Sequence, residues 1–379
     1  MQMFHHKVRK APVLLIATAL VNLALMDSIL AIEDGKPAIA KNVVFITLDG
    51  VRWQEMFRGT DSDLSEGHFG AGEPIFPNLN RLASEGRAFM TGNLDQNQIA
   101  MTSNSDYISL PAYFSMFAGV PQPCHTNGCK RIKVETFPER MMKELGIARG
   151  EVAGFASWYK LPLAMEHIEG SMVTNAGMTA FEGEGSADLA DPELAQINDA
   201  QLNDPPTWDD ARLDKYTYAH ATRYLRTHSP RFLYLSFNDS DEWGHEADYP
   251  KYVETLRTFD HWIGALIDQL ASMGDFGRET LLVITTDHGR GDGNGWHGHG
   301  LLKPDSKYIW LFAGLVSDLV GQRGNRLDPF AWRGVRTHSD LRPTIESALG
   351  LPGVPGCVDC GEALPIGPGP GRSDFFTFN

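Results

Sequence analysis

The sequence predicts an α/β fold with a mostly parallel central sheet and helices on both faces. Four short runs are almost continuously apolar, β-branched or aromatic, which is typical of strands buried on both faces of a parallel sheet. Amphipathic stretches of helical period separate these runs, and this alternation of strands and helices indicates an α/β protein. The predicted strands are residues 43–48, Phe232–Phe237, 281–286 and 308–313.

Helices are predicted from their starting residues and their periodicity. A Pro-Asn step opens the first of them, which is a common pattern at a helix N-terminus. The longest stretch has one apolar face, as expected for a helix that packs on a sheet. That face carries Leu256, Phe259, Ile263, Ile267 and Leu270. The predicted helices are residues 78–87, 135–145, 211–227, 252–272 and 341–350.

Residues 160–215 are predicted to form an insertion or cap beside the sheet. Between residues 166 and 215 the chain has twelve acidic residues against Arg212 and Lys215, many Gly and Ala residues and no clear strand. Such a stretch fits a solvated surface excursion as well as a lid over a substrate. The tail from Gly353 onward is rich in Pro and Gly, which predicts irregular structure.

The N-terminus has the layout of a secretory signal peptide. Lysine and arginine occur within the first ten residues, and residues 11–26 are then almost wholly apolar. This apolar run is shorter than the roughly 20 residues of a spanning helix, so an uncleaved anchor is the weaker alternative. The sequence predicts a signal peptide at residues 1–31, a single domain over residues 32–379, and a periplasmic or secreted protein.

The cysteines form two close pairs, Cys124 with Cys129 and Cys357 with Cys360. In an oxidising compartment such pairs usually form local disulfides. A four-cysteine zinc ribbon is the alternative, although its knuckles are usually tighter than the spacing between Cys124 and Cys129. The pairs therefore predict two disulfides and agree with export.

The charge balance argues against a polyanionic partner. The chain has 33 Lys and Arg against 48 Asp and Glu, a net charge of −15. Nucleic acids and anionic membranes need clustered cations, so neither a nucleic-acid duplex nor, after signal cleavage, a membrane is expected as a partner. A small phosphorylated substrate is compatible, because metal ions can supply local positive charge. The oligomeric state is left open.

Aspartate and histidine follow three of the predicted strands. Asp49 follows the first strand, Asp241 and His245 follow the second, and Asp287 and His288 follow the third. Ligands of open α/β sheets bind beyond the carboxyl ends of the strands, so these side chains should converge. Carboxylate and imidazole are ligands of zinc-like metals, and five or six of them exceed one tetrahedral site. The sequence therefore predicts two divalent metal ions, with Zn²⁺ favoured over manganese and iron.

These segments resemble the alkaline phosphatase superfamily, most of all its nucleotide pyrophosphatase/phosphodiesterase-like branch and bacterial relatives. The resemblance runs from residue 42 to residue 350. Its most specific parts are Leu-Asp-Gly at 48–50, the Asp241 and His245 pair, and Asp-His-Gly at 287–289; residues 76–86 are also similar to the superfamily's first helix. The resemblance implies one alkaline-phosphatase-like catalytic domain and a metal-dependent phosphoric ester hydrolase.

The same resemblance implies a nucleophile and two ligand sets. Residues 109–119 look like the family's nucleophile segment, in which a hydroxyl residue precedes x-Pro and a later Gly, so Ser109 would attack phosphorus. One metal would be held by Asp49, Ser109, Asp287 and His288, and the other by Asp241, His245 and a third histidine. The family's Trp-x-x-His-Gly segment places that third ligand at His299, with His297 as the alternative. A simpler role for Ser109, as a helix N-cap before Pro111, is compatible with this one.

Asn127 is a candidate donor to a phosphoryl oxygen. In the phosphodiesterase branch an Asn follows the nucleophile by a similar distance, and its amide would stabilise charge developing on that oxygen. The alternative is a turn residue within residues 125–128, which have good turn composition. A disulfide between Cys124 and Cys129 would fix this loop near the nucleophile.

Together these features predict an exported two-metal phosphohydrolase that works through a phosphoseryl intermediate. A diester or pyrophosphate substrate is favoured, because aromatic residues near the strand ends offer a slot for a second ester group. These aromatic residues are Trp53, Tyr113, Phe114, Trp243 and Trp296. Arg52 and Arg290 lie beside the motifs and keep a monoesterase or phosphotransferase open. A sulfatase is disfavoured, because Tyr113 replaces the Arg of its modification segment and Gly50 replaces a second Asp. An inactive metal-bearing binding protein is a further alternative.

Overall fold

The computed structural model describes residues 37–322, 327, 334–357 and 359–366. The predicted signal peptide, residues 1–31, lies outside the described residues. Within the described part of the chain, no helix is long and apolar enough to cross a membrane.

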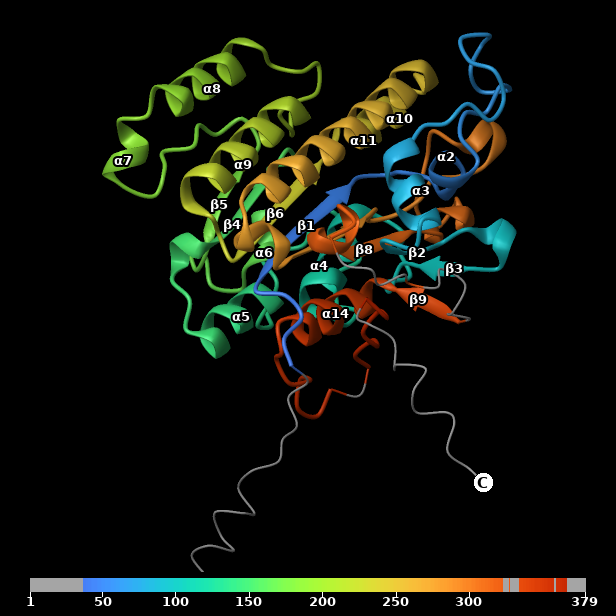
Figure 1. The fold of residues 1–379 in the computed structure, drawn as a ribbon. Coiled ribbons are helices and arrows are strands. Elements are labelled where there is room, and N and C mark those ends of the chain that lie inside the picture. The colour runs from blue at the N-terminus through green and yellow to red at the C-terminus, as the bar shows by residue number, and fades with distance from the viewer. Residues whose placement is uncertain (1–36, 323–326, 328–333, 358, 367–379) are drawn as a thin grey trace, which may run out of the picture. The chain divides into compact units, whose positions relative to one another are not determined.

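A seven-stranded sheet forms the centre of the domain (Figure 1), in the order β2-β8-β7-β1-β6-β4-β5. Its strands are β1 (Asn42–Leu48), β2 (Phe89–Thr91), β4 (Val152–Ala156), β5 (Val173–Ala176), β6 (Phe232–Phe237), β7 (Thr280–Thr285) and β8 (Leu311–Leu315). β7, β1, β6, β4 and β5 are parallel to their neighbours, whereas β8 pairs antiparallel with both β7 and β2. The predicted fold class is confirmed.

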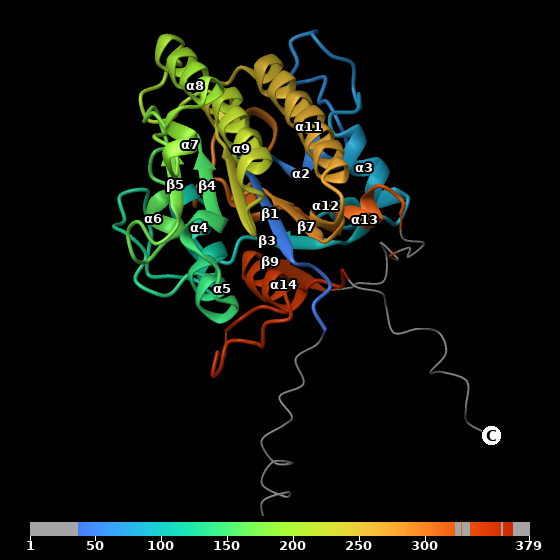
Figure 2. The same ribbon diagram turned by 60° about the vertical axis from the view of Figure 1, so that its left-hand side comes forward.

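Both faces of the sheet are covered, which explains why its central strands are mostly apolar. Every residue of β1 is buried. Val44, Ile46 and Leu48 pack on the side of α9 (Asp214–His228) and α11 (Tyr249–Ser272). The alternate residues of β1 pack on the side of α4 (Ser109–Ala118), α5 (Phe137–Leu145) and α14 (Leu341–Ala348). Figure 2 shows α9 and α11 side by side, where Tyr218 stacks on Trp262 with ring centroids 4.9 Å apart.

Side-chain oxygens satisfy the free amides at the first turn of two predicted helices. Asp260 of α11 accepts from the amides of Asn78 and Leu79 at the start of α3 (Pro77–Ser84), 3.0 and 3.1 Å away. Thr136 and Glu139 form a capping box at the start of α5. The other helices of the described chain are α2 (Trp53–Phe57), α6 (Pro162–Met165), α7 (Ser186–Leu189), α8 (Pro192–Asn203), α10 (Asp239–His245), α12 (Asp275–Arg278) and α13 (Val316–Leu319).

The prediction that residues 166–215 contain no clear strand is wrong. β5 lies in this segment and forms the outer strand of the sheet beside β4. The two strands lack the long apolar runs of β1 and β6: β4 has the sequence VAGFA and β5 has VTNA. After β5, α7 and α8 lead to α9, where buried Arg223 pairs with Asp188 and Asp191. Part of the acidic segment is therefore neutralised by the helix on which it packs.

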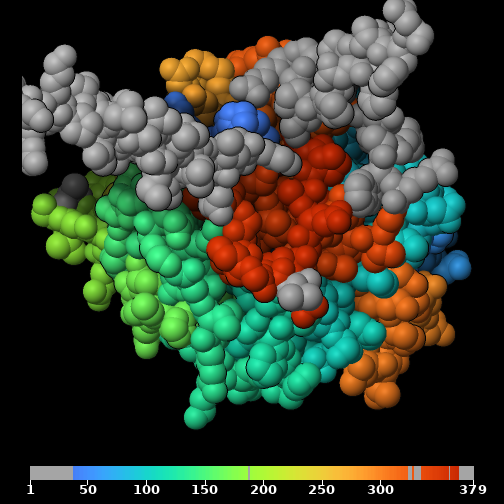
Figure 3. Space-filling view, turned by 90° about the horizontal axis from the view of Figure 1, so that it is seen from below, coloured from blue at the N-terminus to red at the C-terminus, as the bar shows by residue number. Residues whose placement is uncertain are grey.

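The C-terminal part of the described chain lies on the face seen in Figure 3. There the red segment around α14 borders the green segment that carries α5, and the two helices are in contact. Strand β9 (Val335–Thr337) leads to α14 and pairs in parallel with β3 (Ile99–Met101) in a separate two-stranded sheet. Both predicted disulfides are present, Cys124–Cys129 and Cys357–Cys360.

Candidate metal centre

The candidate ligands meet at the carboxyl ends of three neighbouring strands. Asp49 directly follows β1, α10 follows β6, and Asp287 and His288 follow β7. Because β6, β1 and β7 are parallel neighbours, their carboxyl ends lie at one edge of the sheet. The strand order therefore brings these segments together, as predicted.

The first group of ligand atoms surrounds the Nε2 atom of His288. This atom lies 3.5 Å from Asp49 Oδ1 and 3.4 Å from Asp287 Oδ2. Ser109 Oγ, from the first turn of α4, lies 3.3 Å from the same nitrogen. All four side chains are buried. The structure therefore brings together the four residues that were predicted to hold one metal.

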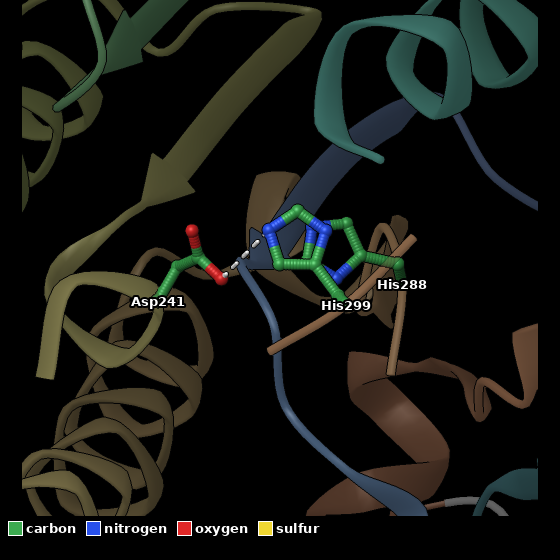
Figure 4. A group of neighbouring side chains, drawn as sticks. All are labelled: Asp241, His288 and His299. Atoms are coloured by element: carbon green, nitrogen blue, oxygen red, sulfur yellow. Dashed lines mark ion pairs between the residues drawn. The ribbon is translucent and has the colours of Figure 1, made fainter. Parts of the chain in front are cut away.

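The second group lies around Asp241, in α10 (Figure 4). Asp241 and His245 are one helical turn apart, with His245 Nε2 3.0 Å from Asp241 Oδ2. His299 Nε2 lies 3.9 Å from Asp241 Oδ1 and 3.2 Å from His245 Nε2. The side chain of His297 is exposed instead, and its carbonyl accepts from Arg290 Nη2 at 2.7 Å. The third histidine of this group is thus His299 rather than His297.

Backbone carbonyls orient the rings of buried His288 and partly buried His299. His288 Nδ1 lies 2.8 Å from the carbonyl of Gly289, and His299 Nδ1 lies 3.2 Å from the carbonyl of Tyr107. A carbonyl only accepts, so Nδ1 carries the proton in each ring and Nε2 presents a lone pair to the cluster. The rings stack with centroids 3.8 Å apart. Both imidazoles therefore have the tautomer that a metal ligand needs.

The donor set fits divalent cations. Asp49 Oδ1 and Asp287 Oδ2 are buried and have no hydrogen-bond partner, although buried carboxylate oxygens normally have one. Ligand atoms of Asp49, Asp287 and His288 lie within 4.8 Å of one another, as do those of Asp241, His288 and His299. A cation between such atoms would satisfy the orphaned oxygens. The two groups adjoin and share His288, whereas the prediction placed His288 in the first set only and His245 in the second.

Burial controls the protonation of this cluster. It raises the pKa of Asp49 well above its usual value, and the nearby Asp287 adds to this effect. It raises the pKa of Asp287 to about 7, and lowers that of His288 to about 4 and that of His299 to about 3. Without a cation the carboxyls favour protons and the imidazoles stay neutral. A divalent cation would favour the ionised carboxylates, and neutral imidazole is already the form that binds metals.

Arg290 holds the second group together. Its buried guanidinium donates to Asp241 Oδ1 and to the carbonyl of Trp296, 3.1 Å away. Burial alone would raise the pKa of Asp241, but Arg290 and then His245 outweigh it and hold that pKa well below its usual value. Gly50, at φ +64°, passes so close that an added Cβ would lie 2.5 Å from Asp241 Oδ1. Only glycine fits there.

The two arginines considered as phosphate ligands have other partners. Arg290 is bonded to Asp241 and the backbone as described, and Arg52 is buried against Glu55. Of the five aromatic residues considered as a slot, Trp53, Tyr113, Phe114 and Trp296 are buried in packing contacts, and only Trp243 is partly exposed. Trp243 lies edge-on to Trp208, with ring centroids 5.2 Å apart. Trp243 is two residues from Asp241 in α10, so the two side chains lie on different faces of that helix.

Asn127 lies beside the nucleophile helix. Its Oδ1 accepts from the amide of Leu110 at 3.0 Å, which fixes the side-chain amide at the start of α4. The carbonyl of Asn127 accepts from Lys160 Nζ, also at 3.0 Å. The N-cap residue of α4 is Ile108, so the prediction of Ser109 as N-cap is wrong by one residue. Ser109 is the first helical residue, and its hydroxyl is directed to His288 instead.

Sequence reasoning missed the role of Tyr113. Its buried hydroxyl donates to Asp49 Oδ2 at 3.0 Å. Tyr113 was considered only as an aromatic wall and as a replacement for the Arg of sulfatases. Its spacing of four residues from Ser109 carried the signal, because residues i and i+4 of a helix share a face.

A cavity of 560 Å³ lies away from the metal cluster, at the outer edge of the sheet. It is lined by β5 and by Arg131, Arg149 and Tyr159, and no predicted ligand borders it. The convergent carboxylates and imidazoles define the candidate site better than cavity size does.

The parallel sheet and the acid–imidazole cluster at its carboxyl edge are the features of an α/β metalloenzyme. A family model described as the Metalloenzyme superfamily matches residues 77–294, more than half of the chain, and the chain belongs to this superfamily. This superfamily agrees with the expected resemblance, and it implies divalent metal ions. No curated protein matches the chain.

Solved structures share the fold at low sequence identity. The lipoteichoic acid synthase LtaP from Listeria monocytogenes is 14% identical over 83% of this chain and 72% of its own, with a TM-score of 0.53. BT1596, a 2-O GAG sulfatase, is 14% identical over 86% and 73%, with a TM-score of 0.54. The integral membrane lipooligosaccharide phosphoethanolamine transferase EptA from Neisseria meningitidis is 11% identical over 88% of this chain and 61% of its own, with a TM-score of 0.50. These likenesses establish the α/β fold.

Proposed function

We propose that the chain is an exported two-metal phosphohydrolase of the nucleotide pyrophosphatase/phosphodiesterase-like branch. Its substrate would be a small phosphate diester or pyrophosphate, cleaved through a phosphoseryl intermediate. One observation carries the proposal: Ser109 Oγ lies 3.3 Å from Nε2 of His288, a residue whose ring lies beside both groups of candidate ligands. The only candidate nucleophile of the family motif thus lies at the junction of the two groups.

Two ligand sets would hold the ions, with Zn²⁺ favoured by the imidazoles. The first set is Asp49, Ser109, Asp287 and His288, and the second is Asp241, His245 and His299. When bound, the two cations supply Lewis acidity, which lowers the pKa of a serine hydroxyl and offsets charge on the phosphoryl and leaving oxygens. The chain supplies the nucleophile and its direction.

Helix α4 positions the nucleophile. Its first residue, Ser109, is buried and points to the cluster, while Asn127 fixes the helix start by accepting from the amide of Leu110. Ser109 Oγ forms a bond to phosphorus as the bond from phosphorus to the leaving oxygen breaks, and that oxygen takes up a proton. Water then attacks the phosphoseryl group, releasing phosphate or a monoester and restoring the serine. The Asn127 amide would donate to a phosphoryl oxygen during both displacements.

The partners of the arginines favour the diester. A monoester carries an additional phosphoryl charge, which enzymes often bind with Arg, yet Arg52 and Arg290 are already paired. The alternative is a monoesterase or phosphotransferase of the same superfamily. The name of EptA supports the transferase alternative, in which an alcohol replaces water as the acceptor.

Export is supported by two features. The signal peptide predicted at residues 1–31 would direct the chain out of the cytoplasm. The Cys124–Cys129 and Cys357–Cys360 disulfides agree with a periplasmic or secreted location, since disulfides persist mainly in oxidising compartments.

A paired rate assay tests the proposal. The mature protein is assayed on a nitrophenyl phosphate monoester and on a nitrophenyl nucleotide diester, with zinc and after chelation. We expect turnover that EDTA abolishes and zinc restores, with the diester cleaved faster. A rate ratio that favours the monoester would select the alternative. Absence of turnover on both esters, in protein shown to carry its metals, would reject phosphohydrolysis.

A further inference from the structure

Tyr113 differs from its buried neighbours because its hydroxyl touches a candidate metal ligand. Tyr113 is fully buried in α4, and its hydroxyl donates to Asp49 Oδ2 at 3.0 Å. The other carboxylate oxygen, Asp49 Oδ1, has no hydrogen-bond partner and lies 3.5 Å from His288 Nε2. The two oxygens of Asp49 therefore have separate environments: one is bound to the protein and the other faces the cluster.

Backbone hydrogen bonds hold the main chain of Asp49 but do not contact its carboxylate. Its amide donates to the carbonyl of Phe237 at 3.0 Å, and its own carbonyl accepts from Ser240 Oγ at 2.6 Å. Neither bond restrains the carboxylate plane. The hydroxyl of Tyr113 donates to Oδ2 of that carboxylate, and this bond favours the orientation in which Oδ1 faces the cluster.

We propose that Tyr113 is a positioning residue that fixes Asp49 as a one-oxygen ligand of the first metal. This inference rests on the proposed function only in taking the Asp49 group as a metal site. Ser109 and Tyr113 lie one helical turn apart on α4, so the same helix presents the nucleophile and orients a ligand of the ion beside it. Partners that orient ligands in this way typically contribute tenfold to hundredfold in metal affinity.

Tyr113→Phe is the direct test, with Tyr234→Phe as its matched control. Both changes delete one buried phenol hydroxyl and keep the ring. The hydroxyl of Tyr234 bonds to Thr47 Oγ1 at 2.7 Å and not to Asp49. A second control, Ser236→Ala, removes the other side-chain contact of the Tyr113 hydroxyl, at 3.5 Å, and leaves Asp49 untouched.

The measurement is Zn²⁺ affinity and stoichiometry, by competition with a chromophoric chelator, together with melting temperature in EDTA. We expect wild type to bind two equivalents, and Tyr113→Phe to bind one of them about 10- to 100-fold more weakly. Tyr234→Phe and Ser236→Ala should stay within about twofold of wild type.

Each result separates this inference from the proposed function. Wild type that binds no zinc would reject the metal site itself. Wild type that binds two equivalents beside Tyr113→Phe with unchanged affinity would reject only the role of Tyr113. Equal losses in Tyr113→Phe and in either control would assign the effect to the buried hydroxyl network as a whole. Failure of Tyr113→Phe to fold even with zinc would make Tyr113 purely structural. Either of these last two results also overturns the inference.

Discussion

Replacing Arg290 by methionine tests how the second ligand group is held. Arg290 is buried, and its guanidinium donates to Asp241 Oδ1, to the carbonyl of Trp296 and to that of His297. It therefore joins α10, which carries Asp241, to the loop that carries His299. Methionine keeps much of the aliphatic volume but has neither charge nor donor.

The expected cost is about 3–5 kcal/mol in the unfolding free energy of the metal-free protein, because removing one partner of a buried ion pair leaves the other charge uncompensated. Zinc beside Asp241 would restore a positive charge next to the same carboxylate. The cost in zinc-loaded protein should therefore be smaller than in EDTA. Zinc should also bind the variant, since all its ligands remain.

Urea unfolding at pH 7, followed by tryptophan fluorescence, measures the unfolding free energy of the protein in EDTA and of the protein loaded with zinc. Arg278→Met is the control, because Arg278 pairs with Asp275 on the surface, where both side chains are exposed. Exposed pairs contribute about 0–1 kcal/mol. The reasoning is refuted if Arg290→Met costs no more than this control in EDTA, or if zinc leaves its cost unchanged.

Three further predictions concern the nucleophile, the pH dependence of stability and the first disulfide. Ser109→Ala should keep zinc binding at the second ligand group and lose turnover by at least about 10³-fold; a variant with wild-type turnover would exclude Ser109 as nucleophile. Burial lowers the pKa of His220 to about 3, whereas its pKa in the unfolded chain is near 6.5. Between pH 6.5 and 3 the unfolded chain therefore binds a proton that the folded chain does not, and the unfolding free energy falls as the pH drops through this range. Between pH 7.5 and 5 wild type should therefore lose about 2 kcal/mol more unfolding free energy than His220→Phe, and equal losses would contradict this assignment. Replacing Cys124 and Cys129 by serine should lower the unfolding free energy by about 2 kcal/mol, because the unfolded chain gains the entropy of the opened loop. The same change should lower turnover by releasing Asn127 from the start of α4, and unchanged turnover would remove Asn127 from the mechanism.

Local sequence pattern was sufficient for the central strands and the long helices. β6 has the predicted bounds, β1 and β7 begin one residue earlier than predicted, and α11 begins three residues earlier. These elements are buried along a whole face or on both faces, so their side chains carry a strong periodic signal. β4 and β5 were missed because they are short and include small or polar residues, and pairing with β6 stabilises them more than propensity does.

The direction of the strand predicted at 308–313 also depended on tertiary structure. β8 lies at Leu311–Leu315 and runs antiparallel to β7. Between them, residues 286–310 contain the loop with His288 and His299 and no α-helix, so no crossover helix returns the chain for a parallel pairing. An apolar run shows that a strand is buried, but not which way it runs.

The sequence by itself determined the α/β class, the Asp and His residues after three strands, the serine at the head of a helix and the cysteine pairs. The residue types that follow each apolar run can be read from the sequence alone, and folding does not change them. The sequence motif also favoured His299 over His297, and the structure places His299 beside Asp241. Only the tertiary structure showed that Arg290 pairs with Asp241 and that Tyr113 binds Asp49. Both contacts join residues more than forty positions apart in the chain. Strand order and helix packing bring such residues together, and the local sequence does not show which of them will meet.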